Sequence, residues 1–249
     1  MNLFAIIILA AILLELVLSI LTNQLNLKAL SSKLPGEFEE IYDAHTYAKS
    51  QEYTKVRTRF GYIVGTFDVS LILGFWFAGG FNSLDVIVRG WHFGELATGI
   101  LYMGILLVAK STIGLPFSIY STFVIEERFG FNKTTPKTFV IDLVKGLLLG
   151  AVIGIPLLAA ILAFFMYTGA WAWLYAWISV TLFTLAMQYI APTWIMPLFN
   201  KFTPLEEGEL KTAIEEYTHK VNFPLTGLFV IDGSKRSSKS NAFFTGFGK

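Results

Sequence analysis

The sequence predicts an α-helical integral membrane protein, in which five transmembrane helices are followed by the opening helix and β-hairpin of an α+β domain. Composition and the spacing of apolar stretches support this prediction. Apolar residues make up 54% of the 249 residues and charged residues only 15%, whereas roughly 25% of residues are charged in soluble proteins. Five separate stretches are also apolar over the length of a membrane-crossing helix, which is about 20 residues.

These five stretches are residues 3–21, 62–80, 96–115, 147–166 and 171–190. A helix in a soluble core is rarely apolar on all sides over such a length, so we interpret each stretch as a membrane span. The charges inside them include Glu15, Asp68 and Lys110. Lys110 makes the third stretch the weakest, because its ammonium group must pair, reach the interface or face water.

Lysine and arginine are unevenly distributed between the segments that connect the spans. Segment 22–61 carries six and segment 116–146 carries four, whereas segment 81–95 carries only Arg89. The first two segments lie on the same side of the membrane as the C-terminus. Because cytoplasmic segments carry an excess of positive charge, we expect a cytoplasmic C-terminus and an N-terminus that is outside or lumenal. The pattern does not distinguish the plasma membrane from the endoplasmic reticulum.

Segment 22–61 also contains a predicted helix, from residue 34 to about residue 59. Pro35 suits the first turn of a helix, where its missing N–H costs nothing. Three glutamates follow it, and a cluster of lysine and arginine lies toward the other end. This charge order favours a helix, since acidic side chains stabilise its N-terminal end and basic side chains its C-terminal end.

The chain after residue 191 is less apolar and has the pattern of a small α+β domain. Residues 203–206 read Thr-Pro-Leu-Glu, which predicts a helix start with a capping box. Leu210, Ile214, Tyr217 and Val221 then form one apolar stripe of an amphipathic helix. Residues 228–231 and 241–246 predict two short strands of a hairpin. One helix and one hairpin bury too little surface to fold alone, so we expect this domain to be incomplete.

The turn between the two predicted strands is basic, with Lys235, Arg236 and Lys239 among serines. We interpret it as a solvated hairpin turn. Contact with lipid phosphates or a substrate carboxylate is the alternative, but three charges are fewer than the roughly 4–8 of lipid-binding clusters.

The residue types present exclude several kinds of chemistry. The chain has no Cys, which excludes disulfides, thiolate metal sites and a thiol nucleophile. His45, His92 and His219 are far apart in the sequence, and we expect no metal site within these residues. The net charge of +1 favours no nucleic-acid partner, since such proteins present strongly basic surfaces. The partners that remain are the lipid bilayer and a peptide or protein substrate.

Four stretches together resemble the type I CAAX prenyl protease family, whose members are membrane-embedded zinc metalloproteases. The stretches are residues 115–133, reading LPFSIYSTFVIEERFGFNK; 192–201, reading PTWIMPLFNK; 202–210, a helix onset; and 233–246, reading GSKRSSKSNAFFTG. They occur in the family's order and the resemblance covers essentially the whole chain. It implies a five-helix transmembrane domain at 1–191 and the incomplete start of a cytoplasmic metallopeptidase domain at 192–249.

The resemblance implies hydrolysis of peptide bonds near the C-terminus of prenylated proteins. Family members hold zinc with H-E-x-x-H and a distant Glu, and the first Glu acts as general base on the zinc-bound water. No H-E-x-x-H occurs in these 249 residues. We therefore expect zinc in the full-length family member, no zinc ligand or catalytic residue in this chain, and an inactive chain that is either a truncated N-terminal portion or a natural half-protein.

The resemblance also implies a substrate-binding role for the last predicted strand. In the family, the strand before the zinc helix is an edge along which an extended substrate can pair. Here its first residues are Asn241, Ala242 and Phe243, and Asn241 is the leading candidate. The alternative is an ordinary asparagine at the junction of a turn and a strand.

Glu15 and Asp68 are carboxylates within predicted spans, where such groups usually face a bundle interior or water. The family's water-filled chamber would accommodate both. Two alternatives to a protease are a non-catalytic membrane protein that binds substrates and, more distantly, a transporter that uses these acids as ion sites. No inverted repeat is visible across the five stretches, and this disfavours transport.

Overall fold

The computed structural model describes residues 2–245, which fall into two compact units. One unit comprises residues up to 94 together with 101–130, and the other comprises 95–100 together with the residues from 131 onward. Within the described residues, five helices are long and apolar enough to cross a membrane, and this confirms the predicted number of spans. They run over residues 3–29, 44–77, 95–126, 136–167 and 169–199.

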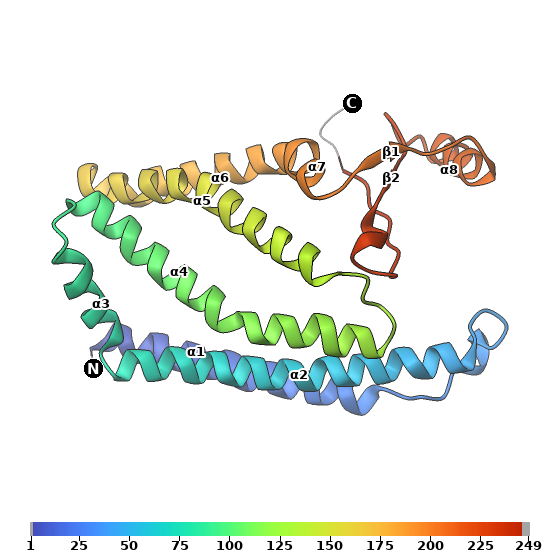
Figure 1. Ribbon diagram of the computed structural model, residues 1–249, viewed down its shortest axis with the longest axis horizontal. Helices are drawn as coiled ribbons and strands as arrows, with labels where there is room; N and C mark the ends of the chain where they lie inside the picture. The colour runs from blue at the N-terminus through green and yellow to red at the C-terminus, as the bar shows by residue number, and fades with distance from the viewer. Residues whose placement is uncertain (1, 246–249) are drawn as a thin grey trace. The chain divides into compact units, whose positions relative to one another are not determined.

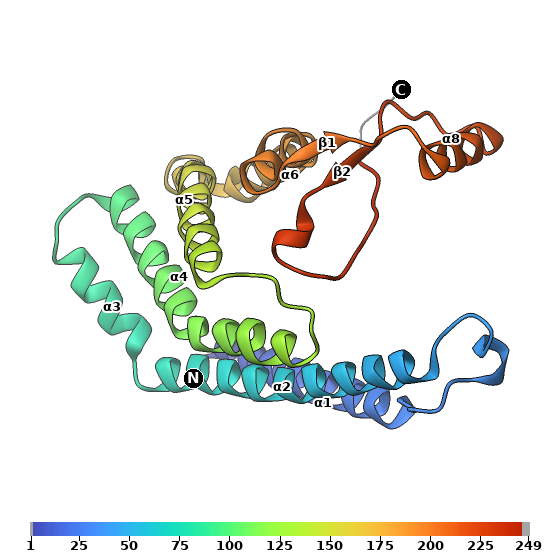
Figure 2. The same cartoon turned by 45° about the vertical axis from the view of Figure 1, so that its right-hand side comes forward.

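The first unit contains α1 (Leu3–Ala29), α2 (Ala44–Phe77), α3 (Gly80–Arg89) and most of α4 (Glu95–Tyr120). A π-helical turn, Ser121–Glu126, extends α4. Helices α1 and α2 lie side by side in both ribbon views (Figures 1 and 2). Aromatic side chains join α2 to α4, where Phe117 contacts both Phe60 and Phe67.

Two features of this unit differ from the prediction. Helix α2 begins at Ala44 rather than near residue 34, because the side chain of Asp43 caps it by accepting a hydrogen bond from the amide of Thr46. Residues 36–38 form only a short 3-10 turn. Helix α3 lies within a segment for which no element was expected, and at ten residues it is too short to have stood out as a span.

The second unit contains α5 (Pro136–Tyr167) and α6 (Ala172–Ile190), which pack against each other as a helical hairpin. A π-helical segment, Ala191–Ile195, and the short α7 (Met196–Phe199) follow α6. The chain then forms β1 (Phe202–Pro204), α8 (Glu209–Lys220) and β2 (Phe229–Ile231). A 3-10 turn at Gly233–Lys235 follows β2.

The two strands pair with each other in antiparallel register, with Phe202 opposite Ile231 and Pro204 opposite Phe229. The prediction of a helix start at Thr203 was therefore wrong, and α8 begins after Gly208. The prediction that residues 228–231 pair with 241–245 was also wrong, because β2 takes β1 as its partner and residues 241–245 form no strand. Gly246, the last residue of the predicted second strand, lies outside the described residues.

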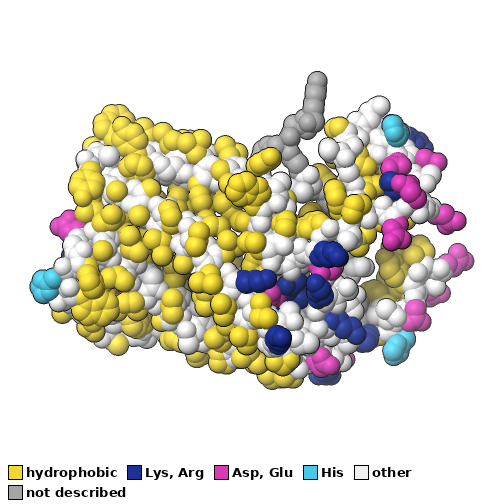
Figure 3. All heavy atoms as spheres, turned by 45° about the horizontal axis from the view of Figure 1, so that its top comes forward, with side chains coloured by type: hydrophobic (Ala, Val, Ile, Leu, Met, Phe, Trp, Pro, Cys, Tyr) yellow, Lys and Arg dark blue, Asp and Glu magenta, His cyan; other side chains and the backbone are white. Residues whose placement is uncertain are grey.

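Few side chains are buried within the described residues, and large apolar ones are exposed along the spanning helices. Figure 3 shows hydrophobic side chains spread over the surface of these helices. In water such a surface would be strongly unfavourable, whereas in a bilayer it contacts acyl chains. The exposed apolar surface agrees with an integral, multi-pass membrane protein.

Candidate functional site

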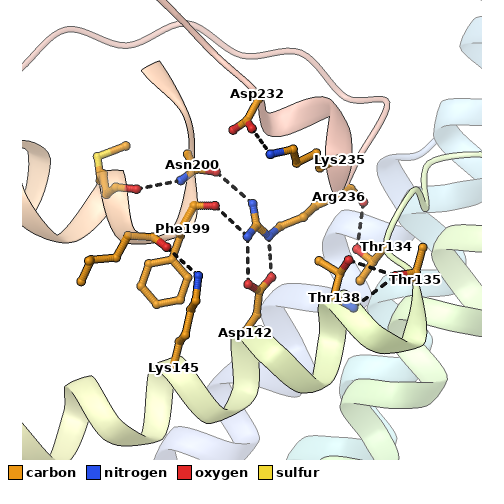
Figure 4. A network of polar contacts seen from close by, with 12 residues as sticks. Thr134, Thr135, Thr138, Asp142, Lys145, Phe199, Asn200, Asp232, Lys235 and Arg236 are labelled. Atoms are coloured by element: carbon orange, nitrogen blue, oxygen red, sulfur yellow. Dashed lines mark hydrogen bonds and ion pairs between the residues drawn. The ribbon is translucent and has the colours of Figure 1, made fainter. Parts of the chain in front are cut away.

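The turn after β2 is anchored to the membrane helices of its unit by Arg236 (Figure 4). Its guanidinium donates from Nε to Asp142 Oδ2 at 2.5 Å and from Nη2 to Asp142 Oδ1 at 2.9 Å. It also donates to Asn200 Oδ1 at 3.0 Å and to the carbonyl oxygen of Phe199 at 2.9 Å. One side chain therefore joins the turn to the second turn of α5 and to the end of α7.

The Arg236–Asp142 contact has the geometry of a strong charged pair. Two parallel N–H···O bonds join the planar guanidinium to the carboxylate, and both side chains are about three-quarters buried. Hydrogen bonding to Asp142 raises the pKa of Arg236 above its usual value, so the guanidinium is charged at every pH of interest.

The main chain of the turn is paired as well. The carbonyl oxygen of Arg236 accepts from the amide of Lys133 at 3.0 Å and from Thr134 Oγ1 at 3.1 Å. The amide of Ser238 donates to the carbonyl oxygen of Phe131 at 3.0 Å. Asn132 and Ser237 form an isolated antiparallel β-bridge. Residues 236–238 thus run antiparallel to residues 131–134, which lead into α5.

These contacts overturn the interpretation of 235–239 as a solvated basic turn for Arg236, whereas Lys235 and Lys239 are exposed as expected. Arg236 is bonded to Asp142, Lys235 pairs with Asp232, and the ammonium of Lys239 lies 4.5 Å from the ring centroid of Phe131. The partners Asp142 and Phe131 lie roughly a hundred residues earlier in the chain. Sequence reasoning missed them because nothing local indicates which distant segment a basic turn will meet.

Asp232 fixes the start of the same turn. Its Oδ1 accepts a hydrogen bond from the amide of Lys201 at 2.7 Å, and its carboxylate pairs with Lys235. The hydrogen bond from Lys235 and that from the Lys201 amide lower the pKa of Asp232 below its usual value. Asp232 therefore joins β2 to the residue before β1 as an ionised carboxylate.

The predicted substrate-binding residues Asn241, Ala242 and Phe243 lie beyond this anchored turn. All three are exposed and belong to no helix or strand. Asn241 Oδ1 accepts from the amide of Ala242 at 2.9 Å, which is a local contact. Among residues 2–245, no main-chain hydrogen bond joins residues 241–245 to another strand.

Phe244 provides a second point of contact for this stretch. Its ring meets the ring of Phe223 edge-on at 5.6 Å, just after α8. Phe223 also lines an open hollow beside α8, together with Leu205, Lys211 and Phe229. The exposed residues 241–243 are thus held on one side by the turn at Arg236 and on the other by an aromatic contact.

The two intramembrane carboxylates have different surroundings. Asp68 on α2 forms an ion pair with Lys110 on α4. Pairing was one of the three outcomes expected for the ammonium group of Lys110. Glu15 lines a shallow apolar depression on α1 with Ala11, Leu18 and Ser19. The structure does not bring Glu15 and Asp68 together in one contact.

A second polar cluster joins α2 to the π-helical turn of the first unit. Tyr53 donates to Glu126 Oε1, and Arg57 donates to Ser121 Oγ at 2.9 Å and to Glu126 at 3.3 Å. Arg128 pairs with Glu52 at 3.0 Å. Two of the basic residues counted for membrane orientation, Arg57 and Arg128, therefore also join segments of this unit, a role that their loop position did not reveal.

The described residues do not fit a zinc ion. Nowhere among residues 2–245 do three or more His, Asp or Glu side chains gather as ligands would. His219 and Glu215 share a face of α8, but two ligands do not make a protein zinc site. No chemical step through a metal can be derived from these residues.

Comparisons with known proteins agree with this arrangement of spans and tail. Residues 23–201 match the family model described as CAAX prenyl protease N-terminal, five membrane helices, and residues 204–249 match peptidase family M48. The chain is 38% identical over 248 residues to CAAX prenyl protease 1 of Saccharomyces cerevisiae, covering 92% of this chain and 52% of the relative. It is 40% identical over 230 residues to a probable CAAX prenyl protease 1 of Schizosaccharomyces pombe, covering 87% and 48%.

A solved structure shares the fold. The crystal structure of Ste24p from S. mikatae superimposes with a TM-score of 0.81 at 37% identity, covering 96% of this chain and 56% of that one. The chain thus spans about half the length of the curated relatives that it matches.

Proposed function

We propose that this chain, which belongs to the CAAX prenyl protease family, forms the N-terminal membrane part of a zinc metalloendopeptidase. The whole enzyme cleaves peptide bonds near the C-terminus of prenylated proteins. Residues 1–191 are the five-helix transmembrane domain, and residues 192–249 are the start of the metallopeptidase domain. Zinc and its ligands belong to the full-length family member, and the 249 residues alone do not hydrolyse peptides.

The observation that carries this proposal is the order of the two family matches along one chain. A five-helix membrane model ends at residue 201, and a peptidase model begins at residue 204. The anchor at Arg236 supports the same organisation, since it bonds the beginning of the peptidase part to spanning helix α5. The membrane part therefore serves as the platform on which a peptide is presented for cleavage.

Within this function, Asn241, Ala242 and Phe243 bind the substrate peptide. Their exposure and the lack of a strand partner in the described chain support the proposal, because an added peptide strand pairs with main-chain groups that no other strand has taken. The amide of Asn241 can both donate and accept, so it suits a peptide backbone. Glu15 and Asp68 are proposed to face water within the membrane part, since charged groups in a membrane span are costly unless they are paired or hydrated.

Peptide binding tests the proposal directly. The chain in lipid nanodiscs is titrated with fluorescent peptides that end in a Cys-aliphatic-aliphatic-X sequence, with and without a farnesyl group. We expect saturable binding that weakens by about 5- to 150-fold in Asn241→Ala, since losing one hydrogen bond to a peptide costs roughly 1–3 kcal/mol. The control variant is Asn82→Ala, an exposed asparagine of α3, and it should bind as the parent does.

Two results would contradict the proposal. Equal peptide affinity of Asn241→Ala and its parent would remove Asn241 from the binding site. Peptide cleavage by the purified chain, or one zinc ion retained per chain after dialysis, would contradict the proposed inactivity.

A non-catalytic membrane protein that binds peptides is the second candidate, because H-E-x-x-H is absent from the 249 residues. The reading frame beyond the codon for Lys249 distinguishes the two. An in-frame H-E-x-x-H supports the protease, and a stop codon supports the binding protein.

A further inference from the structure

The anchored turn and the candidate binding residues are direct neighbours in the chain. Residues 236–238 are paired with 131–134, and Arg236 is bonded to α5 and α7. Asn241 follows three residues after Ser238. Its own hydrogen bond is to the adjacent residue Ala242, so its location depends on the contacts that flank it.

We propose that Arg236 is a positioning residue, which ties the segment 237–243 to the N-terminal part of α5 and so holds it in the place where it binds the peptide. The binding of a peptide rests on the proposed function, whereas the anchoring of the segment does not. Arg236 acts through Asn241 and its neighbours and touches no substrate itself.

Arginine is suited to this role because of the number and direction of its bonds. The guanidinium makes four hydrogen bonds to four acceptor atoms of three residues, which lie on α5 and at the end of α7. A lysine would keep the charge but could not bond all of these acceptors from one plane. Arg236→Lys therefore tests whether the planar, multiply bonded guanidinium is needed or the positive charge alone is enough.

Asp142 provides a second, independent way to weaken the anchor. It accepts two of the four bonds and lies on α5, far in sequence from the turn. Asp142→Asn keeps the shape of the side chain but removes the charge and turns a donor toward the guanidinium. If one of the variants does not fold, the other still tests the proposal.

Hydrogen exchange measures the anchoring without any peptide. In nanodiscs, the amides of Ser238 and Lys239 are protected by the Phe131 carbonyl and by Ser237 Oγ. We expect their exchange to become at least about tenfold faster in Arg236→Lys and in Asp142→Asn, while β2 and α8 exchange as in the parent. Asp85→Asn removes the carboxylate of an ion pair within α3 and should change neither region.

Peptide affinity measures the positioning. We expect Arg236→Lys to weaken peptide binding by about tenfold. In the Arg236→Lys background, Asn241→Ala should cause little further loss of affinity, because the effects of substitutions at residues that act through one another are not additive. Full additivity of the two substitutions would overturn the positioning role.

The remaining outcomes are also decisive. Unchanged exchange of residues 237–243 in both variants would overturn the anchor. Faster exchange across β2 and α8 as well would show that Arg236 only stabilises the tail. A third outcome is faster exchange of residues 237–243 in the variants together with a parent protein that binds no peptide. That result would support the anchoring of the segment by Arg236 and would reject both the proposed function and the positioning role.

Discussion

Arg236 and Asn241 are five residues apart, yet the structure surrounds them very differently. Arg236 is bonded to groups that lie 36, 37 and 94 residues away in the sequence, and Asn241 to its direct neighbour. The sequence could supply the candidate role of Asn241 through a local motif. It could not supply that of Arg236, because a salt bridge to Asp142 depends on how the tail meets α5.

At the residue scale, Asp232 gives a pH-dependent prediction. Its pKa is lower in the folded protein than in the unfolded chain, because it is bonded to Lys235 and to the Lys201 amide. The stabilisation is therefore fully present above the ordinary aspartate pKa, about 3.9, and it is lost as the pH falls through the folded pKa. The melting temperature of the parent should exceed that of Asp232→Asn at pH 7.

That difference should shrink on acidification below about pH 4, the ordinary range of an aspartate. Melting of both proteins in nanodiscs from pH 7 to pH 3 provides the measurement. Glu39→Gln, which removes an exposed carboxylate from the segment before α2, is the control and should show no comparable dependence. A difference that is constant over this range would refute an ionised Asp232 as the cause.

At the scale of elements, apolar length was a reliable guide and strand pairing was not. The spans were predictable because each one carries its own signal, a run of apolar residues that needs no partner to be recognised. The residues of β2 also read as a strand. Its partner could not be read, because Phe202–Pro204 contains a proline and is only three residues long.

The register of the two strands can be tested with engineered cysteines, since the chain has none of its own. Phe202 stands directly opposite Ile231, and opposed residues have Cβ atoms about 4.5–5.5 Å apart, close enough for a disulfide after small adjustment. Phe202→Cys combined with Ile231→Cys should therefore cross-link under mild oxidation, as detected by mass spectrometry of peptides.

The matched control is Ile231→Cys combined with Asn241→Cys, which probes the hairpin that the sequence alone predicted. This pair should cross-link slowly or not at all. Faster cross-linking of Ile231 with Asn241 than with Phe202 would show that β2 pairs with the later segment.

At the scale of the whole molecule, the charge distribution predicts the side of the membrane on which each connecting segment lies. If all five helices cross the membrane, the two ends of the chain lie on opposite sides, and the lysine and arginine residues favour a cytoplasmic C-terminus. Part of that charge has structural roles, as in the contacts of Arg57 with Ser121 and of Arg128 with Glu52. Direct labelling of the connecting segments tests the orientation independently of these charges.

Single cysteines provide this measurement in an otherwise cysteine-free chain. Phe93→Cys lies in the exposed turn after α3, and Glu39→Cys lies in the exposed segment before α2. In sealed vesicles of known orientation, a membrane-impermeant maleimide should label Phe93→Cys only from the non-cytoplasmic side. Glu39→Cys should be labelled only from the cytoplasmic side, because one span, α2, separates the two positions. Both variants should react after permeabilisation, which controls for thiol accessibility. Labelling of both from the same side would contradict the span assignment of α2, and labelling with the sides exchanged would place the peptidase part, and with it Asn241, outside the cytoplasm.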